Sequence, residues 1–229
     1  MTWAIVPAAG RGARFGAELP KQYLTLAGKP LIEHSLRAVL AHADIDGVMV
    51  ALAPGDPHWP GWRELDGRPV YTCLGGAERA DSVLAALQAL PATVSNDQWV
   101  LVHDAARPCL RPKDLARLLQ VGQADPVGAL LAAPLRDTLK RADHLGRSLS
   151  TEPREWLWRA LTPQLFRRGG LTRALDSALK AGAKITDEAM AMERLGLRPC
   201  LVEGSEDNLK VTTPADLALA EFILSKVKA

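Results

Sequence analysis

The residues that decide the fold of this chain are Trp3-Ala4-Ile5-Val6-Pro7-Ala8-Ala9-Gly10-Arg11-Gly12-Ala13-Arg14. The first four are apolar and partly β-branched, which predicts a short buried strand. The residues after them are small, and the Gly and Pro residues that recur up to Lys21 exclude a regular element there. A strand therefore runs directly into a small-residue loop that carries three cations, Arg11, Arg14 and Lys21.

This loop is suited to binding a polyphosphate. Small side chains let backbone N–H groups approach an anion closely, and nearby cations hold its oxygens. The Rossmann dinucleotide pattern fails, because Phe15 stands where a third Gly or Ala is needed, and no Gly-Lys-Ser/Thr of a Walker loop follows. Taken alone, the loop leaves open an ordinary strand-to-helix turn with solvated arginines.

The composition limits the class of protein. Residues 1–229, 48% hydrophobic and 24% charged, are expected to form a soluble globular protein with one large α/β domain or at most two small ones. Its net charge of +2 favours neither nucleic-acid nor membrane binding. We find no signal peptide and no apolar run near the roughly 18 residues of a membrane span. Three scattered cysteines without a CxxC favour a reduced, cytoplasmic protein.

Strands and helices alternate through the first 133 residues, which predicts an α/β fold with a mostly parallel, twisted sheet and helices on both faces. After the first strand, we expect buried strands at 47–52, 70–74, 99–103 and 127–133 and helices at 30–43, from 80 and at 112–122. Later segments are expected to be helical at 164–182, near 190 and at 214–228, and extended at 198–203 and 207–211.

Residues 135–158 break this alternation. They are polar, lack a helical period and contain a turn near 143–146, which predicts a two-stranded hairpin that leaves the sheet. Because such a hairpin is marginally stable alone, we expect it to pack on a second subunit.

Further candidate residues lie at the ends of the predicted strands. Gly76 belongs to a glycine pair that precedes a helix, and Ser82 near that helix start either contacts a ligand or caps the turn. Asp104 follows the strand at 99–103, at the edge where open α/β sheets place their ligands. It either binds Mg²⁺ or caps the following turn.

Phosphorus chemistry fits these groups best. Attack at an α-phosphorus builds negative charge that fixed cations and Mg²⁺ stabilise. No Ser-His-Asp or Cys-His arrangement is apparent. An attacking phosphate oxygen is already anionic at neutral pH, so the reaction needs no general base.

The ordered motifs resemble those of the 2-C-methyl-D-erythritol 4-phosphate cytidylyltransferases. The resemblance covers essentially the whole chain and rests on 7–14, 20–23, 78–83, 102–108, 136–138, 161–164, 185–188 and 208–212. It implies a single Rossmann-like nucleotidyltransferase domain with 135–158 as a dimerisation β-arm. It also implies Mg²⁺-dependent transfer of CMP from CTP to methylerythritol 4-phosphate in the non-mevalonate isoprenoid pathway, with Mn²⁺ or another divalent cation as an alternative.

The resemblance also implies roles for residues of this chain. Arg14 and Lys21 would stabilise the transition state, Arg154 and Lys210 would position the acceptor, and Asp104 would hold the metal. The nucleotide site would contain Ala8, Ala9, Gly10, Gly12, Arg14, Lys21, Gly76, Ser82, Asp104 and Ala105. The acceptor site would contain Arg107, Thr138, Arg154, Thr162, Thr186 and Lys210, with Thr138 and Arg154 serving the neighbouring subunit of a homodimer. Asp207 is a weaker metal candidate.

Two alternative functions stay open. A cytidylyltransferase that uses ribitol 5-phosphate or another sugar phosphate would share the loop, the lysines and the fold. A non-catalytic nucleotide-binding module on the same fold is a different class, but it would not need Lys21, Lys210 and Asp104 together.

Overall fold

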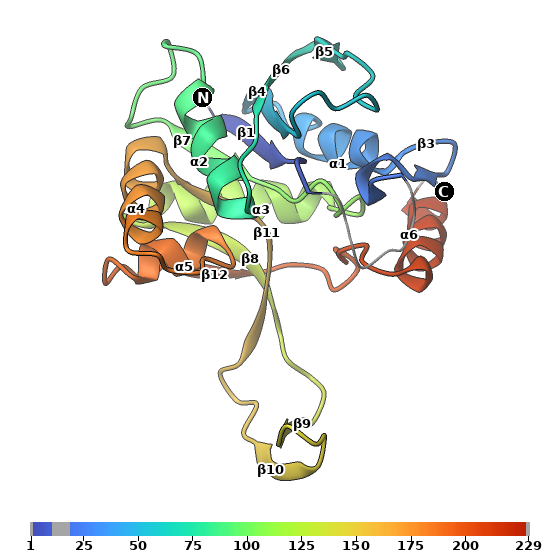
Figure 1. Cartoon of the computed structure of the whole chain (residues 1–229), viewed down its shortest axis with the longest axis vertical. Helices are drawn as coiled ribbons and strands as arrows, with labels where there is room; N and C mark the ends of the chain where they lie inside the picture. Colours follow the sequence, from blue (N-terminus) through green and yellow to red (C-terminus); the bar gives the residue numbers. More distant parts are fainter. Residues whose placement is uncertain (1, 11–18, 228–229) are drawn as a thin grey trace.

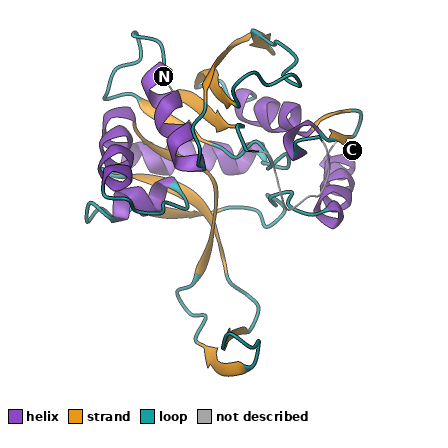
Figure 2. Cartoon of the chain, in the orientation of Figure 1, coloured by secondary structure: helices purple, strands orange, loops and turns teal. Residues whose placement is uncertain are grey.

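The structure is a computed structural model, and it describes residues 2–10 and 19–227. Within these residues the largest sheet has eight strands in the order β12-β8-β11-β7-β1-β4-β6-β5 (Figures 1 and 2). Its strands are β1 (Thr2–Pro7), β4 (Ile45–Leu52), β5 (Glu64–Leu65), β6 (Arg68–Leu74), β7 (Trp99–Val102), β8 (Gly128–Pro134), β11 (Trp158–Arg167) and β12 (Cys200–Glu203).

The sheet is mostly parallel, as predicted. The central strand β1 pairs in parallel with β4 and β7, and the pairs β4–β6 and β8–β12 are also parallel. Strand β11 is antiparallel to both of its neighbours, β7 and β8. Because β1, β4 and β7 run in the same direction, their carboxyl ends meet at one edge of the sheet, where a ligand site is expected.

Helices cover both faces of the sheet. They are α1 (Leu31–Leu40), α2 (Arg79–Ala89), α3 (Pro112–Ala124), α4 (Arg168–Lys180), α5 (Glu188–Glu193) and α6 (Pro214–Val227). Side chains of α1 and α3 pack with Ala4 and Val6 on one face, whereas α2, α4 and α5 pack with Ile5 on the other. Successive side chains of β1 point to opposite faces of the sheet, so this short apolar strand contributes to the hydrophobic cores on both faces.

Two sequence-based boundaries were wrong. Residues 164–167 were expected to be helical, but they complete β11, where Gln164, Leu165 and Phe166 are buried and pair with β7. The helix α4 begins only at Arg168. Residues 207–211 were expected to be extended but form no strand. No helix in the described part of the chain is long and apolar enough to cross a membrane.

The segment between β8 and β11 forms an arm that projects from the body (Figure 1). It contains the two-stranded antiparallel sheet of β9 (Leu139–Ala142) and β10 (Ser148–Glu152). The predicted turn is present, because the amide of Asp143 donates to the carbonyl of Arg147. Large apolar side chains on the arm are exposed, with Trp156 93% exposed. The expected dimer contact through this arm stays a prediction.

Candidate active site

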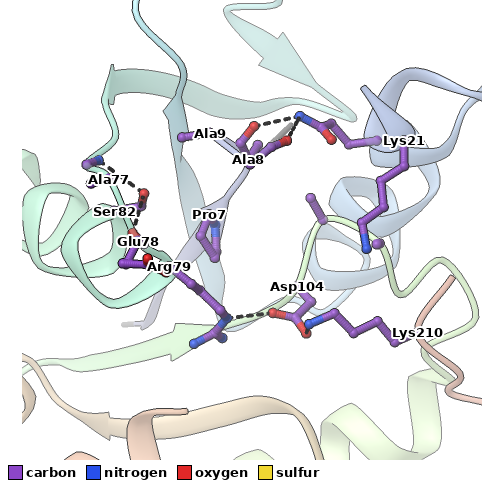
Figure 3. Close-up of a pocket in the computed structure, with 15 residues that line it drawn as sticks. Pro7, Ala8, Ala9, Lys21, Ala77, Glu78, Arg79, Ser82, Asp104 and Lys210 are labelled. Carbon is purple, nitrogen blue, oxygen red and sulfur yellow. Dashed lines mark hydrogen bonds and ion pairs between the residues drawn. The ribbon is translucent and has the colours of Figure 1, made fainter. Parts of the chain in front are cut away.

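A cavity of about 240 Å³ lies at the carboxyl ends of β1 and β7, beside the start of α2 (Figure 3). Strands β1 and β7 are neighbours, so the loops that follow them reach the same space. The cavity brings together the predicted nucleotide-binding residues that the structure describes, namely Ala8, Ala9, Gly10, Lys21, Gly76, Ser82, Asp104 and Ala105. Gly12 and Arg14 lie outside the described residues.

The first loop is held in place by a buried amide side chain. Lys21 and Gln22 belong to a short 3-10 helix, η2 (Lys21–Tyr23), that packs beside the loop. The Nε2 atom of Gln22 donates to the carbonyl oxygens of Ala8, at 2.7 Å, and Gly10, at 3.1 Å. These two bonds leave the backbone of the loop with fixed geometry. Gln22 was not among the predicted site residues, although it directly follows Lys21.

The opposite wall of the cavity is the glycine pair before α2. A Cβ atom at Gly75 would lie 2.5 Å from the Cβ of Ala9, so only glycine permits this approach of the two loops. The Oγ atom of Ser82 accepts a hydrogen bond from the Gly76 amide and donates one to the Glu78 carbonyl, each at 3.1 Å. Ser82 therefore both lines the cavity and holds the turn.

The carboxylate of Asp104 is surrounded by three cationic side chains. Its Oδ1 atom lies 2.9 Å from Arg79 Nε, and its Oδ2 atom lies 2.9 Å from Lys210 Nζ and 3.5 Å from Arg107 Nε. Burial alone would raise the pKa of Asp104, but Arg79, Lys210 and Arg107 outweigh it and hold that pKa well below its usual range. Asp104 therefore stays ionised throughout the neutral pH range.

Arg79 joins this cluster to a second buried carboxylate. Its Nη1 and Nη2 atoms bind the two oxygens of Glu188 at 2.6 and 3.0 Å, and the Glu188 side chain is 1% exposed. Burial would lower the pKa of Arg79, but Glu188 and Asp104 raise it above its ordinary value. The bidentate pair fixes the guanidinium between the end of β7 and the start of α5.

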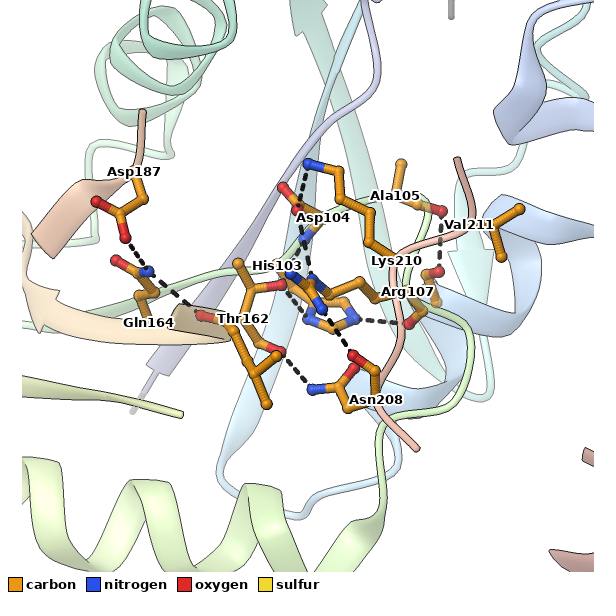
Figure 4. Close-up of polar contacts among 12 residues, drawn as sticks. His103, Asp104, Ala105, Arg107, Thr162, Gln164, Asp187, Asn208, Lys210 and Val211 are labelled. Atoms are coloured by element: carbon orange, nitrogen blue, oxygen red, sulfur yellow. Dashed lines mark hydrogen bonds and ion pairs between the residues drawn. The ribbon is translucent and has the colours of Figure 1, made fainter. Parts of the chain in front are cut away.

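A second cavity, of about 210 Å³, adjoins the same cluster (Figure 4). Four predicted acceptor-site residues line it, namely Arg107, Thr162, Thr186 and Lys210. Arg79, Asp104 and Lys210 line both cavities. The two cavities therefore meet at the Asp104 carboxylate, an arrangement that suits a reaction between two anionic ligands.

His103 lies beneath the cluster and is fully buried. Burial lowers the pKa of His103 to about 4, so its imidazole is neutral at neutral pH. His103 lines neither cavity.

The chain matches the sequence model of the family described as "IspD: 2-C-methyl-D-erythritol 4-phosphate cytidylyltransferase" over residues 2–226. It belongs to this cytidylyltransferase family. A relative of that name from Stenotrophomonas maltophilia (strain R551-3) is 67% identical, covering 98% of this chain and 97% of its own. Another, from Xanthomonas euvesicatoria pv. vesicatoria (strain 85-10), is 66% identical over 97% of this chain and 84% of its own length.

Solved structures of the family share its fold. The cytidylyltransferase of Francisella tularensis superposes with a TM-score of 0.83 at 34% identity, covering 97% of this chain and 99% of that chain. A crystal structure described as 4-diphosphocytidyl-2C-methyl-D-erythritol synthase superposes with a TM-score of 0.81 at 36% identity, covering 97% of this chain and 98% of that chain. The family resemblance inferred from the motifs and the α/β nucleotidyltransferase fold are both confirmed.

Two acceptor residues expected for the cytidylyltransferase site lie elsewhere in this chain. Thr138 and Arg154 are exposed on the arm, where Arg154 donates to the carbonyl of Arg136, and neither lines the two cavities. Their expected role toward a neighbouring subunit stays a prediction. The weaker metal candidate Asp207 pairs with Arg111 and lines a separate hollow between α3 and α6.

Arg79 and Glu188 are the main site residues that the sequence analysis missed. Both stood inside motifs that carried the family resemblance. Neither follows a strand directly, however, and strand ends were the signal used to choose candidates. A pairing between residues 109 positions apart has no local sequence signal.

Asp104 was expected to hold a divalent metal, and that role stays a prediction. In the described residues no group of three or more His, Cys, Asp or Glu could hold an ion. Mg²⁺ in phosphate-transfer sites commonly takes only one or two carboxylates together with substrate phosphates. A carboxylate offers about four lone-pair positions. Arg79 Nε and Lys210 Nζ take one each at 2.9 Å, and Arg107 Nε, 3.5 Å away, makes no hydrogen bond within the described residues, so lone pairs remain for a metal. The donor set therefore fits a metal that is completed by bound phosphate.

Proposed function

We propose that this chain transfers CMP from CTP to the phosphate of 2-C-methyl-D-erythritol 4-phosphate, which gives 4-diphosphocytidyl-2-C-methyl-D-erythritol and pyrophosphate. This reaction is a step of the non-mevalonate isoprenoid precursor pathway. The observation that carries the proposal is the pair of cavities that meet at Asp104, Arg79 and Lys210. The names of the relatives and the solved structures support the same activity.

The reaction joins one phosphate to another. A phosphate oxygen of the acceptor forms a bond to the α-phosphorus of CTP, and the bond from that phosphorus to the bridging oxygen of pyrophosphate breaks. Negative charge grows on the non-bridging oxygens and on the leaving pyrophosphate. We assign its stabilisation to Lys21 and Lys210, which both line the first cavity. Because the acceptor phosphate is already ionised, no proton has to be removed.

A divalent cation, Mg²⁺ in our proposal, would bind at Asp104 together with the phosphates of CTP. It would neutralise charge on the triphosphate when bound. Lys210 and Arg79 hold the Asp104 carboxylate at 2.9 Å each, so the oxygens that would bind the metal are already oriented. The positioning of Arg107 and Lys210 favours an acceptor phosphate in the second cavity.

The proposal includes a cytoplasmic homodimer. The arm carries exposed apolar side chains that would be covered by a second subunit, among them Leu145, Leu149 and Trp156. In that arrangement Thr138 and Arg154 of one subunit complete the acceptor site of the other.

Pyrophosphate release with Mg²⁺ and CTP tests the activity. Reactions with methylerythritol 4-phosphate, with ribitol 5-phosphate and without acceptor are compared, and the cytidylated product is identified by mass spectrometry. Release only with methylerythritol 4-phosphate is expected, and chelation of the metal should abolish it. Release only with ribitol 5-phosphate would favour the alternative acceptor. CTP binding without release under any condition would favour a non-catalytic module.

A further inference from the structure

We propose that His103 and Thr162 form a directional hydrogen-bond relay that positions Asp104 for catalysis. The inference rests on the proposed function, because the reaction is the readout of that positioning. His103 contacts neither cavity, so it acts through its neighbours and is a positioning residue.

The hydrogen bonds around His103 have only one consistent direction (Figure 4). The carbonyl of Arg107 can only accept, so the Nε2 atom of His103, 3.0 Å away, must carry the hydrogen. In a neutral imidazole the Nδ1 atom is then an acceptor, and the Thr162 hydroxyl donates to it at 3.1 Å. The Oγ1 atom of Thr162 in turn accepts from the amide of Asp104 at 3.0 Å.

The relay fixes the backbone of the residue that carries the cation cluster. Its members are buried, since His103 is fully buried and Thr162 is only 4% exposed, so water does not compete for these bonds. Residues 161–163 lie where the pairing register of β11 with β8 is interrupted, between Ala160 and Gln164. Such irregularities commonly re-aim a side chain beside an active site, and here Thr162 reaches the end of β7.

The same relay extends to the loop that carries Lys210. The Nδ2 atom of Asn208 donates to the Thr162 carbonyl at 2.7 Å, and Arg107 Nη1 donates to the Asn208 carbonyl at 2.6 Å. Asp104 and Lys210, which meet across the two cavities, are therefore both tied to Thr162. Displacement of Thr162 would move both partners of this ion pair.

Two amide substitutions at residue 103 separate the two halves of the relay. In His103→Asn the amide occupies the region of Nδ1 and can still accept from Thr162. In His103→Gln the amide reaches the region of Nε2 and can donate to Arg107, but it loses Thr162. Both remove a buried imidazole, so each is the control for the other in protein stability.

We expect His103→Gln to lower kcat by about ten- to a hundredfold, as for misplacement of a catalytic group, and to change KM for CTP far less. His103→Asn should retain most of kcat. Thr162→Val combined with His103→Gln should be no less active than the less active of the two single variants, because both substitutions break the same series of hydrogen bonds. Equal losses in the Asn and Gln variants, or losses that multiply in the double variant, would overturn the relay.

Nitrogen-15 NMR of labelled histidine tests the relay without any reaction. The chain has five histidines, and His103 is assigned by the signal that His103→Asn removes. We expect it to be a fixed Nε2–H tautomer at neutral pH; an Nδ1–H tautomer or an averaged signal would overturn the proposal. If the wild-type protein transferred no CMP but showed the Nε2–H tautomer, the proposed function would fail while the hydrogen-bond geometry stood.

Discussion

The Nζ atom of Lys210 lies 2.9 Å from the Oδ2 atom of Asp104, at the boundary between the two cavities. The contact places a cation beside the ionised Asp104 carboxylate. We expect Lys210→Ala to lower kcat/KM by about two orders of magnitude, as for loss of one preorganised charge. Steady-state kinetics check this, with Lys180→Ala, an exposed lysine at the end of α4, as the control. Equal effects of the two substitutions would contradict the role of Lys210.

Lys21 is expected to matter through its charge on the triphosphate. Its Nζ atom also donates to the carbonyl of Val211 at 3.0 Å, next to Lys210. Lys21→Ala should lower turnover by about two orders of magnitude or more, and Lys21→Arg should restore part of it. Single-turnover measurements with saturating CTP check this. Normal turnover in Lys21→Ala would show that the assignment is wrong.

Arg154 on the arm is expected to act on the acceptor. Arg154→Ala should raise the KM for methylerythritol 4-phosphate and leave CTP binding intact, because Arg154 lies outside the nucleotide cavity. Arg141→Ala, which removes another exposed arginine of the arm, is the control. An effect confined to CTP would contradict the arm hypothesis.

Mixing the Lys21→Ala and Arg154→Ala variants tests whether Arg154 serves the neighbouring subunit, if the acceptor is held at a concentration far below the raised KM, where each variant alone turns over little. A mixed dimer of Lys21→Ala and Arg154→Ala subunits contains one site with both native residues. Half of randomly assorted dimers are mixed, and each has one intact site of two, so about a quarter of wild-type activity should return. No gain on mixing, with subunit exchange verified, would place Arg154 on its own subunit's site.

Glu188 is expected to stabilise the fold through Arg79. Glu188→Ala leaves a largely buried guanidinium with one carboxylate partner fewer, and loss of one member of a buried pair costs about 3–5 kcal/mol. Urea unfolding measures the change, with Glu152→Ala on the exposed arm as the matched control. A Glu188→Ala protein as stable as the control would show that the pair contributes little.

Burial of neutral His103 should make stability fall in mild acid. Its pKa is lowered to about 4 in the folded state, against 6.5 when exposed, so the unfolded chain binds more protons between these values. The stability is therefore fully present above pH 6.5 and declines as pH falls toward 4, by roughly 3 kcal/mol in total. Unfolding of wild type and His103→Asn at several pH values checks this; parallel curves would refute it.

Much of the fold was predictable because local signals agreed with one another. The apolar run before Pro7 predicted the central strand, and the break after residue 134 predicted the arm. The failure at residues 164–167 has a physical cause. Gln164-Leu165-Phe166-Arg167 is too short to show a period of its own next to a helical segment, and only pairing with β7 and β8 makes it a strand.

The site was predictable where its residues follow strands or a glycine turn. Asp104, Lys21 and Ser82 were chosen in that way, and all three line one cavity, while their roles stay predictions. Arg79, Glu188 and His103 were not, because their importance comes from contacts between distant segments inside the protein. A buried guanidinium and a fixed imidazole are properties of packing, which a single sequence does not display.

The sharing of three side chains between the cavities limits how this protein can be engineered. Redesign of Arg79, Asp104 or Lys210 for a new acceptor would also alter the nucleotide cavity. Library positions for a changed acceptor preference are better drawn from residues that line the second cavity alone, such as Ala160, Thr186 and Asp187. These positions do not line the first cavity, so their variation tests the proposed acceptor role of the second cavity by itself.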